Sequence, residues 1–370
     1  MMALLKSPYI IILVWLAFMY FVGQADVFKE HVVIYGESKV RYKWWFAFLV
    51  FFPVIYFAAT RGDVADTPLY KATYMGMPSG LIAGIKAGLE MKKDQGFYVF
   101  TGILHAFLGD HYVWYFFIIA LIQGISLVSI YRKYSTSFFT SIFLFIVSSD
   151  YYSWMFNGIR QFTAVVIILA ATDWLIRRKY IRYILVVVFA SFMHKSALIM
   201  IPIAFIVQGR AWNKRTLIAI FLAILAVVYA NQFTNLLNDA LQETQYKNVV
   251  SDWNEFEDTG TNIIRVAVYS VPAFLSIIGY KTIRDEGDDL INICTNMSIL
   301  TAGIYLVSSY TSGIFVGRLP IYCSLYNYIL LPWEIKHMFT RRSTSTVNML
   351  MILAYLAFYY YQMHVAWGIF

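Results

Sequence analysis

The chain has 370 residues, of which 60% are hydrophobic and only 14% are charged. A soluble globular protein carries about a quarter charged residues, so the composition excludes a soluble fold and indicates a membrane protein. The net charge of +8 comes without a basic stripe, a zinc-ligand spacing or a recognition helix, so we expect no nucleic acid partner.

Uninterrupted apolar runs divide the chain into segments that can cross a bilayer. Lipid cannot pair backbone polar groups, so a run of about 17–25 apolar residues in a membrane forms a helix. No repeated alternation of polar and apolar residues indicates membrane-spanning strands. We predict one all-α polytopic membrane domain over residues 1–370, with about 12 transmembrane helices, at 8–22, 44–59, 112–131, 137–150, 160–176, 181–194, 196–208, 216–231, 264–280, 290–311, 317–333 and 347–363.

Lysine and arginine set the predicted orientation, because they concentrate in cytoplasmic loops. Five basic clusters fall in every second loop between the predicted spans, so we place those loops in the cytoplasm. The clusters are Arg132-Lys133, Arg177 to Arg182, Arg210 to Arg215, Lys281 with Arg284, and Lys336 to Arg342. The outer side then holds the loop region 60–111 and the acidic loop 232–263, which has six acids against one lysine.

The loop region 60–111 contains one conflict with this orientation. Residues 60–96 carry five basic side chains, although the order of the spans places them outside. Residues 97–108 are short for a span, so we expect a re-entrant or interfacial segment there. If they cross the membrane instead, the N-terminus moves to the cytoplasm.

Ionisable side chains at the ends of apolar runs are the candidates for function, because charges at membrane depth are costly. The first group follows the second span and contains Arg61, Asp63, Asp66 and Tyr70. Arg61 suits a phosphate, whereas Asp66 or Asp63 suits a base or a contact to a hydroxyl. The alternative is a solvated loop with a local ion pair.

The second group, Asn157, Arg160 and Gln161, enters the predicted span 160–176. The first turn of a helix has free backbone N–H groups and the positive end of the dipole, which together favour an anion. Arg160 is therefore unfavourable in that turn unless something negative binds beside it. The alternative is that Arg160 extends to the lipid headgroups.

The third group is His194 and Lys195, at the outer junction of two short apolar runs. Histidine has the side-chain pKa closest to neutrality, so it suits proton transfer. The alternative is a structural histidine that caps a helix or forms a fixed hydrogen bond.

The fourth group is Arg318 and Tyr322, where an arginine opens an apolar run; the alternative is again a headgroup contact. In the predicted topology, Arg61, Arg160, His194 and Arg318 all lie at the outer face. Several arginines on one side suit a pyrophosphate, which arginine binds bidentately. No nucleotide-binding loop or zinc pattern occurs, so we expect no cofactor and no metal.

Four blocks of the sequence give a resemblance to a known family. They are RG…DTPLY from Arg61 to Tyr70, NGIRQ from Asn157 to Gln161, HKSAL from His194 to Leu198, and GRLPIY from Gly317 to Tyr322. The chain resembles, over most of its length, the EpsG family of bacterial exopolysaccharide and O-antigen polymerases, the Wzy-like proteins.

The resemblance implies a GT-C-like glycosyltransferase of the bacterial inner (cytoplasmic) membrane, with its active site facing the periplasm or exterior. Its substrates would be undecaprenyl-pyrophosphate-linked oligosaccharide repeat units, which it joins into a surface polysaccharide. Arg160, Arg318 and Arg61 would neutralise the departing pyrophosphate, and Asp66 or His194 would accept the proton of the attacking hydroxyl. Further substrate contacts are expected from Asp63, Tyr70, Asn157, Gln161, Lys195 and Tyr322.

The partners implied are the lipid bilayer and, as candidates, a chain-length regulator and a flippase. One rival is a ligase of the same chemistry that passes the glycan to a different acceptor. Another is a transporter or flippase for lipid-linked sugars, although such a protein normally buries charges near the bilayer midplane and often contains internal repeats. The last is a membrane acyltransferase that uses His194, which leaves the outer arginines unexplained.

Overall fold

The computed structural model describes residues 7–34, 37–241 and 259–369, which are mostly helical. The chain divides into two compact units. The first unit contains Met1–Asp173, Ile181–Ala197 and Val347–Phe370, and the second contains Trp174–Tyr180 and Leu198–Thr346. Each unit is described by itself below.

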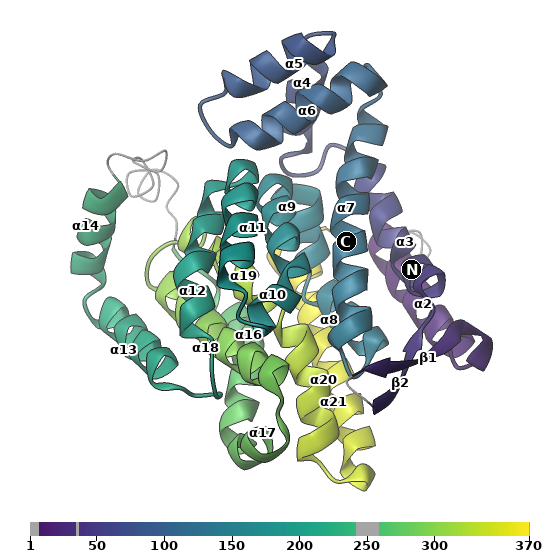
Figure 1. Cartoon of the computed structure of the whole chain (residues 1–370), viewed down its shortest axis with the longest axis vertical. Helices are drawn as coiled ribbons and strands as arrows, with labels where there is room; N and C mark the ends of the chain where they lie inside the picture. The colour runs from purple at the N-terminus through teal and green to yellow at the C-terminus, as the bar shows by residue number, and fades with distance from the viewer. Residues whose placement is uncertain (1–6, 35–36, 242–258, 370) are drawn as a thin grey trace. The chain divides into compact units, whose positions relative to one another are not determined.

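The first unit is built on the long helix α7, against which α3 and α9 pack (Figure 1). The predicted spans 8–22 and 44–59 are confirmed as helices within the same bounds. The elements of this unit are α2 (Pro8–Val22), η1 (Asp26–Phe28), β1 (Lys29–Ile34), β2 (Glu37–Tyr42), α3 (Trp44–Ala59), α4 (Thr67–Met75), α5 (Leu81–Leu89), α6 (Gln95–Leu108), α7 (Tyr112–Tyr134), α8 (Phe138–Val147), the π-helix η2 (Tyr151–Asn157), α9 (Ile159–Ala170), α11 (Tyr180–Met193), most of α21 (Arg341–Tyr360) and η5 (Tyr361–Ala366).

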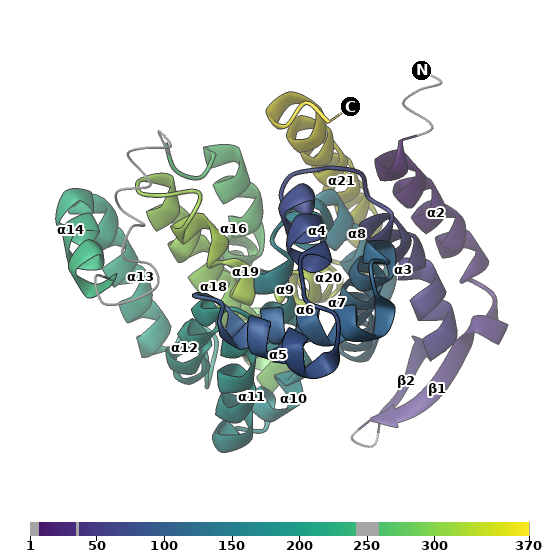
Figure 2. The same cartoon turned by 90° about the horizontal axis from the view of Figure 1, so that it is seen from above.

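A two-stranded antiparallel hairpin, β1–β2, connects α2 and α3, and the sequence did not predict it (Figure 2). Glu30 of β1 forms ion pairs with Arg41 of β2 and with Arg132 near the end of α7. Close by in the chain, Lys133 of α7 pairs with Asp173. These basic residues lie in or next to loops that the sequence places in the cytoplasm. Within the first unit they lie at the same end of α7.

Helices α4, α5 and α6, here called the α4–α6 layer (residues 67–108), lie at the other end of α7 (Figure 1). The α5 and α6 backbones are in direct contact, because a Cβ on Gly102 would lie only 2.4 Å from the Gly84 carbonyl oxygen. The outer surface of the layer exposes apolar side chains, among them Ile82 and Phe107. The interfacial or re-entrant position expected for residues 97–108 stays a prediction.

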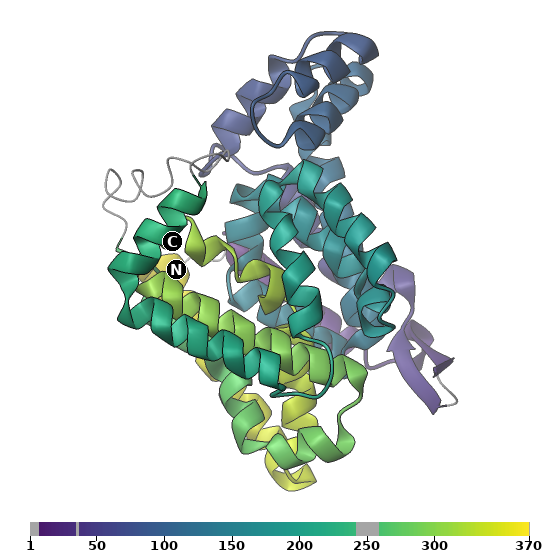
Figure 3. The same cartoon turned by 60° about the vertical axis from the view of Figure 1, so that its left-hand side comes forward.

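The second unit is centred on α18 (Asp289–Ser309), with α13 (Lys214–Val228) alongside it (Figure 3). Its remaining elements are α12 (Met200–Ile206), α14 (Ala230–Leu241), α16 (Ile263–Ile278), α17 (Tyr280–Glu286), η4 (Val316–Arg318), α19 (Ile321–Ser324) and α20 (Asn327–Met338), and at its borders with the first unit lie α10 (Thr172–Ile176) and η3 (Lys195–Ile199).

One prediction for the second unit needs correction. The run 317–333 is not one helix but three short ones, because backbone bonds such as Tyr326 N–H to the Cys323 carbonyl close tight three-residue turns. The first residues of the predicted acidic outer loop 232–263 belong to the helix α14. Most of that loop, residues 242–258, lies outside the described residues.

Fewer helices are long enough to cross a membrane than the sequence predicted. Among the described residues, three helices are long and apolar enough to cross a membrane: α7, α18 and the continuous stretch Arg341–Ala366. The number rises to six if each bent pair of helices counts as one span. Several other predicted spans are apolar helices of 10–17 residues, so the prediction of twelve spans is not confirmed.

We expect the two ends of α7 to face opposite sides of the membrane. Phe116 and Arg132 are separated by about 24 Å along the helix at 1.5 Å per residue, which approaches the thickness of the hydrocarbon core. A Ser79→Cys variant, at an exposed position of the α4–α6 layer, should react with an impermeant thiol reagent in intact cells. A Thr136→Cys variant, just after α7, should react only after permeabilisation, and equal reaction of both in intact cells would contradict the orientation.

Candidate functional site

A sharp bend in the first unit places Arg160 at the start of a helix, as the sequence predicted. The π-helix η2 and α9 meet at an angle of 112°, with Gly158 between them. Arg160 is the second residue of α9. Gln123 of α7 donates to the Ile159 carbonyl oxygen at 3.3 Å and to Thr163 Oγ1 at 3.1 Å, which fixes the first turns of α9 against α7.

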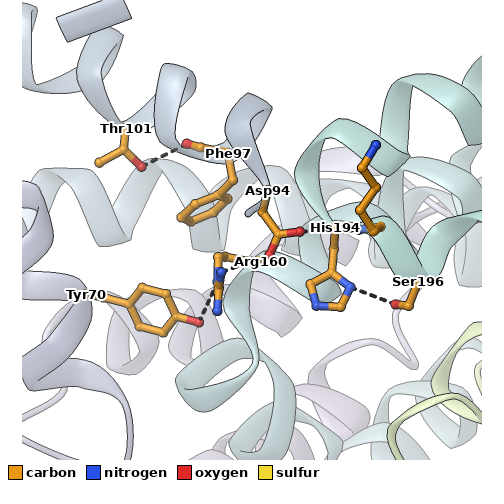
Figure 4. A network of polar contacts seen from close by, with 8 residues as sticks. Tyr70, Asp94, Phe97, Thr101, Arg160, His194 and Ser196 are labelled. Atoms are coloured by element: carbon orange, nitrogen blue, oxygen red, sulfur yellow. Dashed lines mark hydrogen bonds and ion pairs between the residues drawn. The ribbon is translucent and has the colours of Figure 1, made fainter. Parts of the chain in front are cut away.

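Arg160 connects α9 to the α4–α6 layer (Figure 4). Its Nη1 donates to Asp94 Oδ2 at 2.8 Å, and its Nε donates to the Tyr70 hydroxyl at 3.4 Å. The guanidinium also lies 5.7 Å from the centre of the Tyr98 ring. The Asp94 side chain is only 3% exposed, whereas that of Arg160 is 26% exposed. One side of the guanidinium is therefore occupied by a carboxylate, while part of it still reaches the surface.

Asp94 also connects Arg160 to the segment that contains His194. Asp94 has a left-handed backbone (φ 51°) immediately before α6. Its Oδ1 accepts a hydrogen bond from the Lys195 backbone N–H at 3.3 Å. The next glycine permits the approach, because a Cβ on Gly96 would lie 2.6 Å from Phe192 Cβ. Asp94 thus joins the start of α6, the start of α9 and the end of α11.

The sequence analysis missed Asp94 and Tyr98. Asp94 stands in the charged run Lys92-Lys93-Asp94-Gln95, which is typical of a solvated loop. The only signal in the sequence is an acidic residue directly before an apolar helix, and that is also the pattern of an ordinary N-cap. In the structure the Asp94 side chain does not cap α6.

Arg61 reaches η2 from the loop after α3. Its Nη1 donates to the Met155 carbonyl oxygen at 2.5 Å, and its guanidinium carbon lies 4.2 Å from the centre of the Phe116 ring. Its Nε and Nη2 are buried and have no hydrogen-bond partner among the described residues. Burial lowers the pKa of Arg61 to about 10, so the group is still positive at neutral pH.

The three candidate bases occupy different environments. Asp66 immediately precedes α4 and its side chain makes no capping bond, whereas Asp63 is exposed. Burial raises the pKa of Tyr70, Arg160 lowers it, and the negative charge of Asp66 raises it by a smaller amount. The Asp66 carbonyl oxygen accepts a hydrogen bond from the Tyr70 backbone N–H at 3.1 Å. His194 follows α11, and its Nδ1 lies 2.7 Å from Ser196 Oγ (Figure 4).

The remaining predicted residues are distributed over both units. Asn157 ends η2, and Gln161 is buried in α9. Arg318 and Tyr322 belong to the second unit, so the convergence of Arg318 with the other arginines stays a prediction. Within the described ranges, no group of three His, Cys, Asp or Glu side chains is arranged to hold a metal ion.

The Asp94–Arg160 pair can be tested by exchanging its charges. Each single change, Asp94→Arg or Arg160→Asp, should abolish function and lower stability by up to about 3–5 kcal/mol, because it leaves two like charges together. The double variant should recover protein level and thermal stability but not function, because the guanidinium then projects from α6 instead of α9.

The matched control is the same exchange at the exposed pair Arg284–Asp285, which should change neither property. Full function of the Asp94→Arg/Arg160→Asp variant would show that the pair has only a structural role.

Comparison with known proteins places the chain in a family. The model of the EpsG family matches residues 44–368. No curated protein and no solved structure matches the chain. The family match includes α3, the α4–α6 layer, and the segments that carry Arg61, Arg160, His194 and Arg318. The chain therefore belongs to the EpsG family.

Proposed function

We propose that this multi-pass membrane protein polymerises undecaprenyl-pyrophosphate-linked oligosaccharide repeat units into a surface polysaccharide, at the outer face of the bacterial inner membrane. Membership of the EpsG family supports a polysaccharide-polymerase type of function. The proposal includes a GT-C-like arrangement of about twelve spans, in which short apolar helices cross the membrane beside longer ones.

The observation that carries the proposal is the state of Arg61. A buried guanidinium with two unpartnered donor nitrogens is costly unless a ligand completes it. Guanidinium groups bind phosphate oxygens through pairs of parallel hydrogen bonds. Arg160, in the first turn of α9, offers a second positive group and free backbone N–H donors in the same unit. A pyrophosphate ester is the ligand that both groups suit.

The reaction we propose is a displacement at the anomeric carbon of the donor sugar. A hydroxyl of an incoming repeat unit attacks that carbon and forms the new glycosidic bond. The bond from the anomeric carbon to the phosphate oxygen breaks, and its electron pair leaves with the lipid pyrophosphate. Arg61, Arg160 and Arg318 stabilise the leaving charge. Direct displacement of this kind inverts the anomeric centre.

The proton of the attacking hydroxyl goes to a nearby base. Asp66 is our first choice because it precedes α4 by one residue, one turn before Tyr70, whose hydroxyl accepts a hydrogen bond from Arg160. His194 is the second choice, because the backbone N–H of the next residue, Lys195, donates to Asp94. Asp63, Tyr70, Asn157, Gln161, Lys195 and Tyr322 are proposed as further contacts to the substrate.

Glycan analysis of a strain that lacks the gene tests this function. Loss of a polymerase leaves single repeat units attached to lipid or core. Loss of a ligase accumulates lipid-linked polymer, and loss of a flippase leaves neither product outside. Single repeat units are the expected result, and either of the other two patterns would contradict the proposal.

We predict that Arg61 is needed for polymer production although its unpartnered donors lower the stability of the substrate-free protein. The Arg61→Met change removes two buried donor nitrogens without partners, each of which costs about 1–3 kcal/mol, and this gain should at least offset the loss of the one hydrogen bond to the Met155 carbonyl oxygen. We expect the purified variant, free of substrate, to melt at or above the temperature of the unchanged protein, while polymer production in cells is lost.

Arg182→Met, at an exposed position at the start of α11, is the control and should change neither measurement. An Arg61→Met variant that still makes polymer would remove the anion-binding role.

A further inference from the structure

The π-helix η2 has one face that is fully anchored to its own unit. The Tyr151 hydroxyl lies 2.7 Å from the Tyr359 hydroxyl, which in turn donates to the Tyr9 carbonyl oxygen at 3.3 Å. The neighbouring Tyr152 ring stacks on Trp367 with 5.3 Å between the ring centres. Helices α2 and α21 therefore hold this face through hydrogen bonds and aromatic contacts.

The opposite face of the same segment carries polar atoms that lack partners. Ser153 and Asn157 are about one turn apart in η2, while Tyr151 lies about half a turn from Ser153 and so on the other side. Ser149 lies in the turn just before η2. Ser149 Oγ, Ser153 Oγ and Asn157 Oδ1 are buried and have no hydrogen-bond partner among the described residues. The same holds for the indole Nε1 of Trp154.

Four unpartnered polar side chains in nine residues require an explanation, because buried polar groups in folded proteins are almost always paired. The segment is also conformationally unusual: it is a π-helix, and Ser149 has a positive φ of 63°. Both features are enriched at functional sites. Ser153 and Asn157 are only half-buried, so this face reaches the surface at its C-terminal end.

The chemistry of the four atoms identifies the class of ligand. The serine hydroxyls donate and accept, the indole N–H only donates, and the amide oxygen only accepts. An anion needs donors alone and a metal cation needs acceptors alone, whereas a neutral polyol needs both. The Trp154 side chain is only 4% exposed, so it contributes its N–H donor rather than a ring face. The set therefore fits a carbohydrate.

The same segment contacts the proposed phosphate site. Met155, which lies between Ser153 and Asn157 in the chain, accepts the hydrogen bond from Arg61 Nη1. We propose that Ser149, Ser153, Trp154 and Asn157 form a carbohydrate subsite that binds the sugar attached directly to the pyrophosphate held by Arg61. This subsite rests on the proposed function, because it takes the sugar of the same lipid-linked donor.

The test compares two ligands on the full-length protein in nanodiscs. One is the lipid-linked repeat unit extracted from the deletion strain, and the other is undecaprenyl pyrophosphate without sugar. The variants are Ser153→Ala and Trp154→Phe, which each remove one polar group and retain most of the packing. The control is Ser126→Ala in α7, whose hydroxyl already donates to the Ile122 carbonyl oxygen.

Each variant should weaken binding of the sugar-bearing lipid about two- to tenfold, the value of one neutral hydrogen bond, and leave binding of the sugar-free lipid unchanged. The control should bind both ligands as the unchanged protein does, and all variants should retain its melting temperature. Equal weakening of both ligands, or no weakening of either, would overturn the subsite.

The two hypotheses fail in different ways. If the unchanged protein binds the sugar-free lipid and the sugar-bearing lipid equally well, the subsite is wrong while the phosphate site stands. If it binds neither lipid, the proposed function is wrong as well.

Discussion

The bend between η2 and α9 is the constraint on which the site depends. Lipid cannot pair backbone groups, so any carbonyl released by a broken helix must find a partner inside the protein. At this bend, Arg61 donates to the Met155 carbonyl. Gln123 holds the first turns of α9 against α7 through Ile159 and Thr163. The hydrogen bond from Arg61 therefore offsets part of the free-energy cost of breaking the helix. Arg61 keeps two further donor nitrogens that have no partner among the described residues.

The two arginines of the first unit are consequently in different states. Arg160 already has a carboxylate, Asp94, against one side of its guanidinium, whereas no described carboxylate pairs with Arg61 and two of its donors are unpartnered. An incoming anion gains more from Arg61, which has no counter-charge to displace. Arg160 is held in place by its contacts with Asp94 and Tyr70 of the α4–α6 layer.

The sequence predicted the positions of most helices, because apolar runs of sufficient length leave few alternatives in a membrane. It failed where contacts between distant segments decide the structure. The break within 317–333, the β1–β2 hairpin and the role of Asp94 all depend on packing that local composition does not encode. Arg61, Arg160 and His194 were identified because a charge beside an apolar run is conspicuous, while Asp94 sits among other charges and is not.

The contact between α5 and α6 has a consequence for how such a protein can diversify. Because Gly84 and Gly102 bring the two backbones together directly, main-chain atoms set the spacing of α5 and α6. Buried aromatic side chains such as Tyr74 and Phe97 pack the layer against α7. The residues that point away from that contact are free to change without loosening it. Substitutions on the exposed face of α5 and α6 can therefore leave the spacing of the two helices unchanged, whereas a side chain at Gly84 or Gly102 would force them apart.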